Sequence, residues 1–409
     1  MKLWQQVIIG LILGIVAGIV LGENAAGLKI FGTIFINLIK MVIVPLIFFA
    51  LLSGITSMDG EGNFTRVGLK GFGSYIITAV FAVIIGLLAG TIFQPGAGID
   101  LHSILETSGN VTSAAVTKTP PTASEFLLGL IPTNPLGAMV NDNFLQIIVF
   151  SIFMGITINL VGAKARPVKD FIHSASQVSF KMIELIIRLA PIGVFGFISW
   201  IVGTQGLDIL ESLMKLILVV LFACVFQYFV FGLMILVFAR LSPLPFYRKI
   251  FLTQSIAFST SSSKATLSTA MTQLQDRLGV SKTNSNFLMP LGVCINMDGT
   301  AIYLGICALF FSQAYGITLS PQDYLMLVMT CTFGSIGAAG IPSGSIIFMS
   351  MVLSSVGLPI EGIGIILGID RVLDMVRTTI NITGDSAITL IVDKSEGTLD
   401  EKAYYSKTL

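Results

Sequence analysis

Long apolar runs dominate the first 240 residues of this chain, and each can cross a bilayer as a helix, which needs about 20 residues for a ~30 Å core. Only 11% of the 409 residues are charged, whereas a soluble domain carries about a quarter. So few charges cannot cover a water-exposed surface of this size. The sequence therefore predicts an all-α polytopic membrane protein, with apolar runs at 4–22, 28–56, 70–94, 144–162, 178–203 and 213–240.

The distribution of basic residues predicts how these helices insert, because cytoplasmic loops are enriched in Lys and Arg. Counting from a cytoplasmic N-terminus, the loops expected inside carry Arg66 and Lys70, then a basic group within 164–169, then Arg240 and Arg248. The connection 95–143 is rich in Thr, Ser, Pro and Gly and is expected to be a flexible external loop. We expect a cell (inner) membrane protein with both termini in the cytoplasm.

Charge and cysteine usage exclude other classes. The net charge of +1 provides no basic stripe for a nucleic-acid partner. The cysteines lie in apolar stretches without CxxC spacing, so they indicate buried apolar side chains rather than disulfides or a zinc site. They are Cys224, Cys294, Cys307 and Cys331.

Two later segments are long enough to cross the membrane but are interrupted in the middle. The segment 245–283 contains the polar run Ser259–Lys264, and 320–359 contains a Gly-rich break at Gly334–Pro342. Each half is too short to span, which favours re-entrant hairpins. A kinked helix or a packing seam of small residues is the alternative. A long helix with polar residues follows each hairpin, and this repetition is typical of secondary transporters with a site near the bilayer midplane.

Five polar residues of the last helix share one narrow face at 100° per residue, with Thr378 at its edge. Left unpaired in the membrane, its charges would cost about 2.5–3.5 kcal/mol each. A purely structural ion network is one interpretation. The other is a substrate site in which Asp374 binds an ammonium group, Arg377 binds a carboxylate bidentately and Asn381 hydrogen-bonds a second carboxylate. The face consists of Asp370, Asp374, Arg377, Asn381 and Asp385.

The run Asn296-Met297-Asp298-Gly299-Thr300 interrupts the preceding long helix. Local unwinding at Gly299 would free backbone carbonyls and let Asp298 face inward with them. A cage of carboxylate, amide, hydroxyl and carbonyl oxygens suits a hard cation. Sodium is the natural candidate for a symporter, although these ligands alone do not distinguish it from protonation of Asp298.

Four motifs in this order, SSSKATL, NMDGT, SIGAAGIP and D-x3-D-x2-RT-x2-N-x2-GD, resemble the sodium:dicarboxylate symporter family, and the resemblance covers essentially the whole chain. The family includes excitatory amino-acid transporters and prokaryotic aspartate and glutamate carriers. The resemblance implies eight transmembrane helices plus two re-entrant helical hairpins with inverted repeats, in a homotrimer whose transport part moves like an elevator against a scaffold. It implies scaffold helices in 1–69 and 144–205, transport helices in 70–94 and 206–241, an external loop at 95–143, hairpins at 245–283 and 320–359, long helices at 284–315 and 360–394, and a cytoplasmic tail at 395–409.

The resemblance also implies roles for individual residues. Asp374 would bind the substrate amino group, Arg377 the side-chain carboxylate, and Thr300 and Thr378 would assist. Asn381, Ser262 and Ser263 would hold the α-carboxylate, and Gly340 and Ile341 would belong to the outer gate. Three groups of residues would bind co-transported Na+: Gly292, Asn296, Asn381 and Asp385; Tyr75, Thr78, Asn296, Asp298 and Thr300; and carbonyls of Cys294, Ser335, Ile336 and Ala338 near Met297.

The chain departs from the family pattern at two charged positions. Some prokaryotic members have an arginine at the position of Ser261, and animal members have one at the position of Met375. Lys264 and Arg371 are therefore candidates to balance Asp374 in the empty site, and potassium counter-transport stays open. Proton-coupled relatives commonly lack an acid at the position of Asp385, so its presence favours sodium.

Enzyme functions fit poorly, because His102 and His173 lie in or beside loops and Gly384-Asp385 lacks the first glycine of an aspartyl intramembrane protease motif. We predict a sodium-coupled symporter of an acidic amino acid, aspartate or glutamate. The alternatives are a proton-coupled glutamate or dicarboxylate symporter and a sodium symporter of neutral Ser or Thr. A neutral substrate would leave the guanidinium of Arg377 unpaired.

Overall fold

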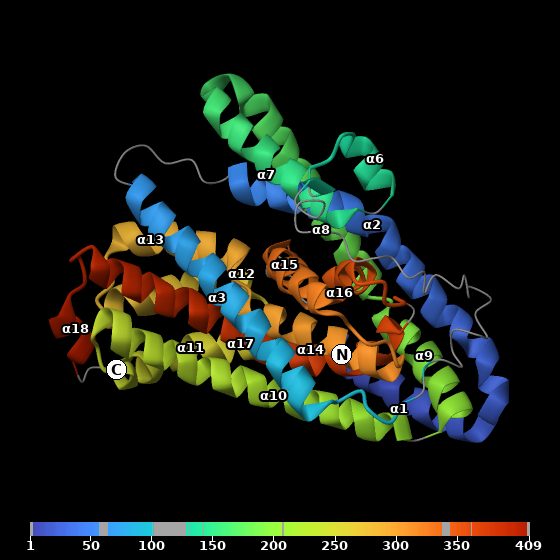
Figure 1. Cartoon of the computed structure of the whole chain (residues 1–409). Helices are drawn as coiled ribbons and strands as arrows, with labels where there is room; N and C mark the ends of the chain where they lie inside the picture. Colours follow the sequence, from blue (N-terminus) through green and yellow to red (C-terminus); the bar gives the residue numbers. More distant parts are fainter. Residues whose placement is uncertain are drawn as a thin grey trace.

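The computed structural model describes residues 3–56, 64–99, 101, 128–129, 131–141, 143–206, 208–337, 344–360 and 362–406. Every regular element within these ranges is helical, and none is a strand (Figure 1). The α-helices are α1 Leu3–Leu21, α2 Lys29–Thr56, α3 Phe64–Phe93, α6 Pro135–Val140, α7 Phe144–Val161, α8 Arg166–Ile187, α9 Ala190–Gln205, α10 Asp208–Met234, α11 Pro243–Thr260, α12 Ser263–Thr272, α13 Lys282–Ile295, α14 Asp298–Ala314, α15 Pro321–Gly337, α16 Gly344–Ser355, α17 Ile363–Ser395 and α18 Glu401–Tyr405.

Large apolar side chains face outward along many of these helices. Val20 of α1 is 76% exposed and Leu160 of α7 is 83% exposed. A soluble protein rarely exposes apolar surface on this scale, whereas hydrocarbon covers it without cost. By length and composition, five stretches of the described chain can cross a membrane: Gln5–Phe35, Arg66–Phe93, Gln146–Ile187, Leu210–Ala239 and Lys282–Ala314. The prediction of an all-helical protein with several apolar helices is confirmed.

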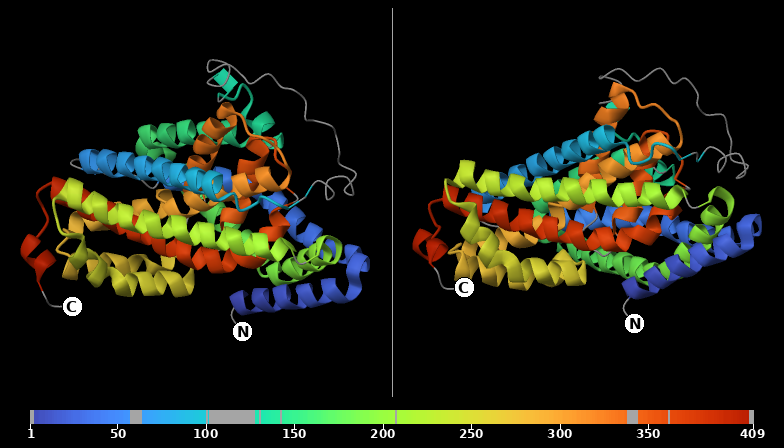
Figure 2. Two further views of the ribbon diagram at one scale, coloured as in Figure 1. Left: turned by 60° about the horizontal axis from the view of Figure 1, so that its bottom comes forward. Right: turned by 90° about the horizontal axis from the view of Figure 1, so that it is seen from below.

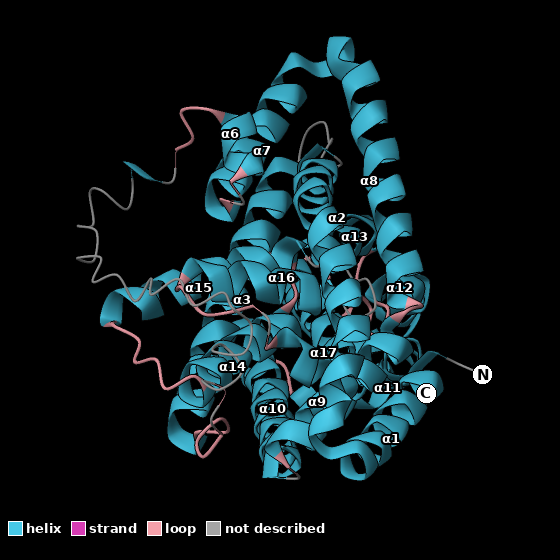
Figure 3. Ribbon diagram, turned by 90° about the vertical axis from the view of Figure 1, so that its right-hand side faces the viewer, coloured by secondary structure: helices cyan, strands magenta, loops and turns pink. Residues whose placement is uncertain are grey.

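The helices pack in two groups, which we call the first and second helix groups (Figure 1, Figure 2). In the first group α1 and α2 pack against α9, and α7 and α8 diverge from a turn at Gly162–Ala165 to pack against α2 (Figure 3). The second group comprises α3 and α10–α17, packed around α14 and α17. The long helix α17 also contacts α1 and α9. A Cβ on Gly368 of α17 would lie 2.6 Å from Leu11 of α1. A larger residue at this boundary would have to displace the end of the Leu11 side chain.

Two pairs of helices occupy the segments predicted as hairpins. In the first pair α11 packs against α12, and the chain reverses at Ser261, which has a left-handed φ of 52°. In the second pair α15 packs against α16, and Ser355 Oγ donates to Thr330 Oγ1 at 3.3 Å. The prediction that the second break begins at Gly334 was wrong. Helix α15 continues to Gly337, because Gly334 makes room for Met351 of α16 instead of ending the helix.

Three other boundaries also differ from those predicted. The run 178–203 is divided between α8 and α9, because Pro191 at the start of α9 has no N–H for a continuous helix. The long helix expected at 284–315 is divided between α13 and α14 as predicted, but the break lies at Asn296 and Met297 rather than at Gly299. Part of the expected external loop forms the short helix α6, whose first turn Asn134 caps by accepting from Gly137 N at 3.0 Å.

Several polar contacts bind the elements of the second group together at one end. The buried Lys249 Nζ donates to the carbonyls of Arg277, Ala403 and Tyr404 at 2.7–2.8 Å. Lys70 at the start of α3 pairs with Glu396 just after α17. The starts of α3 and α11 and the end of α17 therefore lie together. The opposite end is marked by the bond from Gly96 N to Gln313 Oε1 at 2.9 Å.

Candidate functional site

The polar face predicted for the last helix lies inside the protein. Helix α17 has 33 residues and is therefore about 50 Å long. It packs against α10, α11, α13 and α14, which keep this face away from hydrocarbon. The five residues of this face are at most 6% exposed: Asp370, Asp374, Arg377, Asn381 and Asp385.

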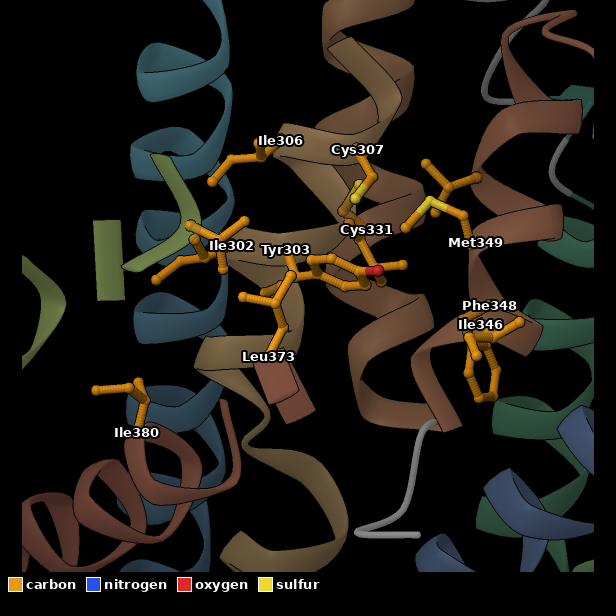
Figure 4. Close-up of a cluster of buried hydrophobic side chains, with 14 of the residues drawn as sticks. Ile302, Tyr303, Ile306, Cys307, Cys331, Ile346, Phe348, Met349, Leu373 and Ile380 are labelled. Atoms are coloured by element: carbon orange, nitrogen blue, oxygen red, sulfur yellow. The ribbon is translucent and has the colours of Figure 1, made fainter. Parts of the chain in front are cut away.

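Arg377 lies at the centre of this face and is completely buried. Its Nη2 donates to Asp370 Oδ1 at 2.9 Å and to Asp374 Oδ1 at 3.0 Å. The ring of Tyr303 stacks 3.9 Å from its Cζ, and Figure 4 shows Tyr303 extending from α14 into a buried cluster that includes Cys331. Nε and Nη1 have no hydrogen-bond partner in the described part of the chain. Nη2 is thus held by two acids, while the N–H groups of Nε and Nη1 can donate to a carboxylate.

Asp374 is paired with two arginines. Besides its bond to Arg377, its Oδ2 lies 3.5 Å from Arg371 Nη1. Lys264, the other candidate from the sequence, has its Nζ 4.3 Å from the centre of the Phe180 ring. Arg371 rather than Lys264 is therefore the second cation beside Asp374. The sequence placed Asp370 on this face without a role; in the structure it pairs with Arg377 and accepts from Ser345 Oγ at 3.3 Å.

The chain unwinds between α13 and α14, but not at the predicted residue. The break is at Asn296 and Met297, whose backbones are extended or irregular, and α14 begins at Asp298. Gly299 belongs to the first turn of α14, where a Cβ would lie 2.6 Å from the carbonyl oxygen of Arg377. Its N–H donates to Asn381 Oδ1 at 2.8 Å. The glycine therefore permits close packing on α17 rather than the unwinding.

Oxygen atoms surround two buried carboxylates next to this break. Asn296 Nδ2 donates to Asp385 Oδ1 at 3.0 Å, and Thr78 Oγ1 donates to Asn296 Oδ1 at 3.0 Å. Asp298 Oδ2 accepts from Gln227 Nε2 at 3.3 Å. Asp298 Oδ1 and Asp385 Oδ2 are buried without a hydrogen-bond donor among the described residues. A buried carboxylate in this condition is costly unless a proton, a cation or a water molecule satisfies it.

Most residues predicted to bind cations lie around these two carboxylates. A Cβ on Gly292 would lie 2.9 Å from both Asp385 Oδ1 and Tyr75 OH, so these three residues meet. Thr300 is buried in the first turn of α14. Asn381 contacts Gly299 and, through Nδ2, the sulfur of Met297 at 3.2 Å.

The third predicted cation group lies where α13 and α15 end. Cys294 in the last turn of α13 and Ile336 in the last turn of α15 pack against the same apolar cluster as Tyr75. Ser335 is buried and donates to the carbonyl of Thr332 at 2.7 Å. Ala338 lies outside the described residues. In the described part of the chain no three His, Cys, Asp or Glu side chains cluster as metal ligands, so a cation here must use amide, hydroxyl and carbonyl oxygens as well.

The residues predicted to hold the substrate carboxylates come from two elements. Ser262 Oγ accepts from Ala265 N at 3.2 Å and so caps α12. Ser263 is fully buried, and its Oγ has no hydrogen-bond partner within the described ranges. Thr378 is buried on α17, which α12 contacts. Gly340 and Ile341 lie outside the described residues.

Sequence reasoning missed Gln227, which binds Asp298 from α10. The signal was present, because Gln227 is a lone amide in the apolar run 216–239. A polar residue within a membrane span is a candidate for function by default.

Known proteins resemble this chain along nearly its full length. The model of the sodium:dicarboxylate symporter family matches residues 3–395. The chain belongs to this family. It is 33% identical over 411 residues to the proton/sodium-glutamate symport protein of Bacillus caldotenax, covering 97% of this chain and 95% of the relative. It is 34% identical over 379 residues to the proton/glutamate-aspartate symporter of Escherichia coli K12, covering 91% of this chain and 86% of the relative. It is also 34% identical over 410 residues to the C4-dicarboxylate transport protein of Bacillus subtilis 168, covering 98% of this chain and 96% of the relative.

Membership of the sodium:dicarboxylate symporter family confirms the resemblance seen in the four motifs, and it identifies the chain as a transporter and not an enzyme. In this symporter, helix ends lie beside the polar face of α17. Helices α12 and α14 contact α17 and begin near it, and the positive end of a helix dipole favours anions. Helix α13 ends against α17 and α15 ends against α13, and the negative end of a helix dipole favours cations.

Proposed function

We propose that this protein is a secondary active symporter that takes up an acidic amino acid, aspartate or glutamate, together with sodium ions. The observation that carries the proposal is the fully buried Arg377, whose Nε and Nη1 have no hydrogen-bond partner in the described chain. The N–H groups of these two atoms can donate to a substrate carboxylate, the acceptor that a guanidinium favours. A neutral Ser or Thr substrate would leave these donors unpaired in a buried site, which disfavours that alternative.

Asp374 supports an amino acid over a dicarboxylate that lacks an amino group. Relatives of this chain are named for glutamate, for glutamate and aspartate, and for C4-dicarboxylates. A carboxylate beside the binding edge of Arg377 attracts an ammonium group and repels a further carboxylate. The proposed substrate therefore presents its side-chain carboxylate to Arg377, its ammonium to Asp374 and its α-carboxylate to Ser263 and Asn381.

The surroundings of Asp298 and Asp385 support sodium as the coupling ion. Both carboxylates have an unpartnered oxygen among the described residues, and hydroxyl and amide groups from Thr78 and Asn296 lie beside them. A mixed set of oxygen ligands near helix C-termini matches the ion sites of transporters with broken helices. Inward movement of each positive charge gains about 2.3 kcal/mol per 100 mV of membrane potential, so several sodium ions can drive uptake against a substrate gradient.

The two helix groups support an elevator mechanism. We propose that the second group, which carries the polar face, moves against the first group, and that the first group forms the contacts of a homotrimer. Because Arg66, Lys70 and Lys249 lie at one end of the second group, the positive-inside rule assigns that end to the cytoplasmic side of the inner membrane. Gly368 lies at the boundary between the two groups, where a small residue permits sliding.

Uptake into proteoliposomes tests this function directly. Uptake of radiolabelled aspartate or glutamate is measured in vesicles that contain the purified protein. Three conditions are compared: an inward sodium gradient, an inward proton gradient in sodium-free buffer, and no gradient. We expect accumulation only with sodium, and faster accumulation when the interior is negative. Equal uptake under the proton gradient would establish the proton-coupled alternative, for which the unpartnered oxygen of Asp298 would be the proton acceptor. Uptake of serine but not aspartate would establish the neutral alternative.

A further inference from the structure

Arg371 is a charged residue of α17 to which the proposed substrate contacts give no role. Its side chain is 14% exposed, and its Nη1 lies 3.5 Å from Asp374 Oδ2. Nε and Nη1 are buried and have no hydrogen-bond partner in the described chain. Arg371 is therefore attracted to Asp374 by charge without the geometry of a hydrogen bond.

The position of Arg371 on the helix explains this loose contact. At 100° per residue it lies about 60° from Gly368, which faces the first helix group, and about 60° from Asp374 on the polar face. Arg371 thus approaches Asp374 from the edge of the site, whereas Arg377 lies within it. Its guanidinium can leave Asp374 along this boundary without entering the core of the second group.

The four charges of this part of α17 cancel when no substrate is present. Asp370 and Asp374 balance Arg371 and Arg377. The contacts of Arg377, at 2.9 and 3.0 Å, are hydrogen bonds, while that of Arg371 is longer. A substrate ammonium brings three donors to Asp374. It displaces the weaker partner, so Arg371 and the ammonium compete for the same carboxylate oxygen.

We propose that Arg371 is a positioning residue that sets the choice between amino acids and C4-dicarboxylates by neutralising Asp374. While Arg371 pairs with Asp374, a dicarboxylate meets a neutral network and binds. Without Arg371, the charge of Asp374 is less compensated, and an ammonium group becomes necessary for binding. The unmodified site therefore prefers an amino acid but still admits a dicarboxylate at lower affinity, and loss of the Arg371 charge strengthens the preference for amino acids. This inference rests on the proposed acidic amino-acid site.

Binding titrations at saturating sodium test the inference with aspartate and succinate as probes. The proteins are the unmodified chain, the neutral variants Arg371→Gln and Arg371→Met, and the charge-conserving Arg371→Lys. We expect the ratio of the succinate Kd to the aspartate Kd to rise by about tenfold or more in both neutral variants, equivalent to about 1.4 kcal/mol. Arg371→Lys should keep the ratio near that of the unmodified protein, which a merely structural role of the arginine would not predict. Sodium-dependent thermal stabilisation of each variant verifies folding.

The outcomes separate this inference from the proposed function. If the unmodified protein binds no acidic amino acid, both the proposed function and the role of Arg371 are overturned. Unmodified protein that binds aspartate but not succinate, or neutral variants in which both affinities change equally, overturns the role of Arg371 and leaves the amino-acid site intact.

Discussion

Replacing Arg377 by cysteine should strongly weaken binding of acidic amino acids, because this guanidinium is fully buried and its Nε and Nη1 have no hydrogen-bond partner among the described residues. A carboxylate that accepts from both atoms gains two charge-assisted hydrogen bonds of about 1.5–3 kcal/mol each. Their loss weakens aspartate binding by about 3–6 kcal/mol, or roughly 10²- to 10⁴-fold. A neutral amino acid such as serine or cysteine should bind comparatively better, because it presents no second carboxylate to the remaining acids.

The same substitution affects the empty protein. Removing one partner of a buried ion pair typically costs about 3–5 kcal/mol. Here Arg371 still neutralises Asp374 and Ser345 still bonds Asp370, so we expect a loss near the lower end of that range. Thermal unfolding of the substrate-free protein measures it.

Isothermal titration of the purified protein at constant sodium measures the binding effect. Arg377→Lys is the matched control, since it keeps the charge but not the planar fork, and its aspartate affinity should be intermediate. The expected loss of aspartate affinity is at least roughly 10²-fold. If Arg377→Cys instead binds aspartate within about threefold of the unmodified protein, Arg377 does not contact the substrate carboxylate.

Three further substitutions test other parts of the structure. Asp385→Asn should weaken sodium binding by about tenfold or more, because one ligand loses its charge; a sodium titration that matches the unmodified protein would contradict this. Lys249→Met should lower the unfolding temperature, since it leaves the carbonyl of Arg277 and two carbonyls of the C-terminal segment without their donor, and unchanged protease resistance of residues 396–406 would count against the contact. The bond from Lys70 holds the pKa of Glu396 below its ordinary value, so Glu396→Gln should destabilise the protein near neutral pH. That difference should shrink once the pH falls below the ordinary glutamate pKa of about 4.3, and disappear when the pH is also below the lowered pKa of folded Glu396; a difference that persists in strong acid would refute the ion pair.

Parts of the site could be predicted because they depend on local sequence. Residues 370, 374, 377, 381 and 385 share a face in any regular helix, and charges in an apolar segment cannot face lipid. The interrupted segments were equally evident, since each half is too short to span a membrane. The four ordered motifs indicated the sodium:dicarboxylate symporter family, which the comparisons confirm.

The boundaries of several elements could not be predicted in this way. Gly299 and Gly334 were interpreted as helix breakers, yet both lie within helices and permit close packing on Arg377 and Met351. Glycine gives the same local signal for a break and for a close contact. Only the neighbouring helix decides between them.

The sequence by itself determined that this protein is helical and resides in a membrane, and that one face of its last helix is polar, because periodicity and hydrophobicity act over neighbouring residues. The tertiary structure decided the partners of each charge: Tyr303 against Arg377, Gln227 at Asp298, and Arg371 instead of Lys264 beside Asp374. A buried charge pairs with whichever group packing brings within about 3–4 Å. That distance is set by contacts between helices far apart in the chain, so no local pattern contains it.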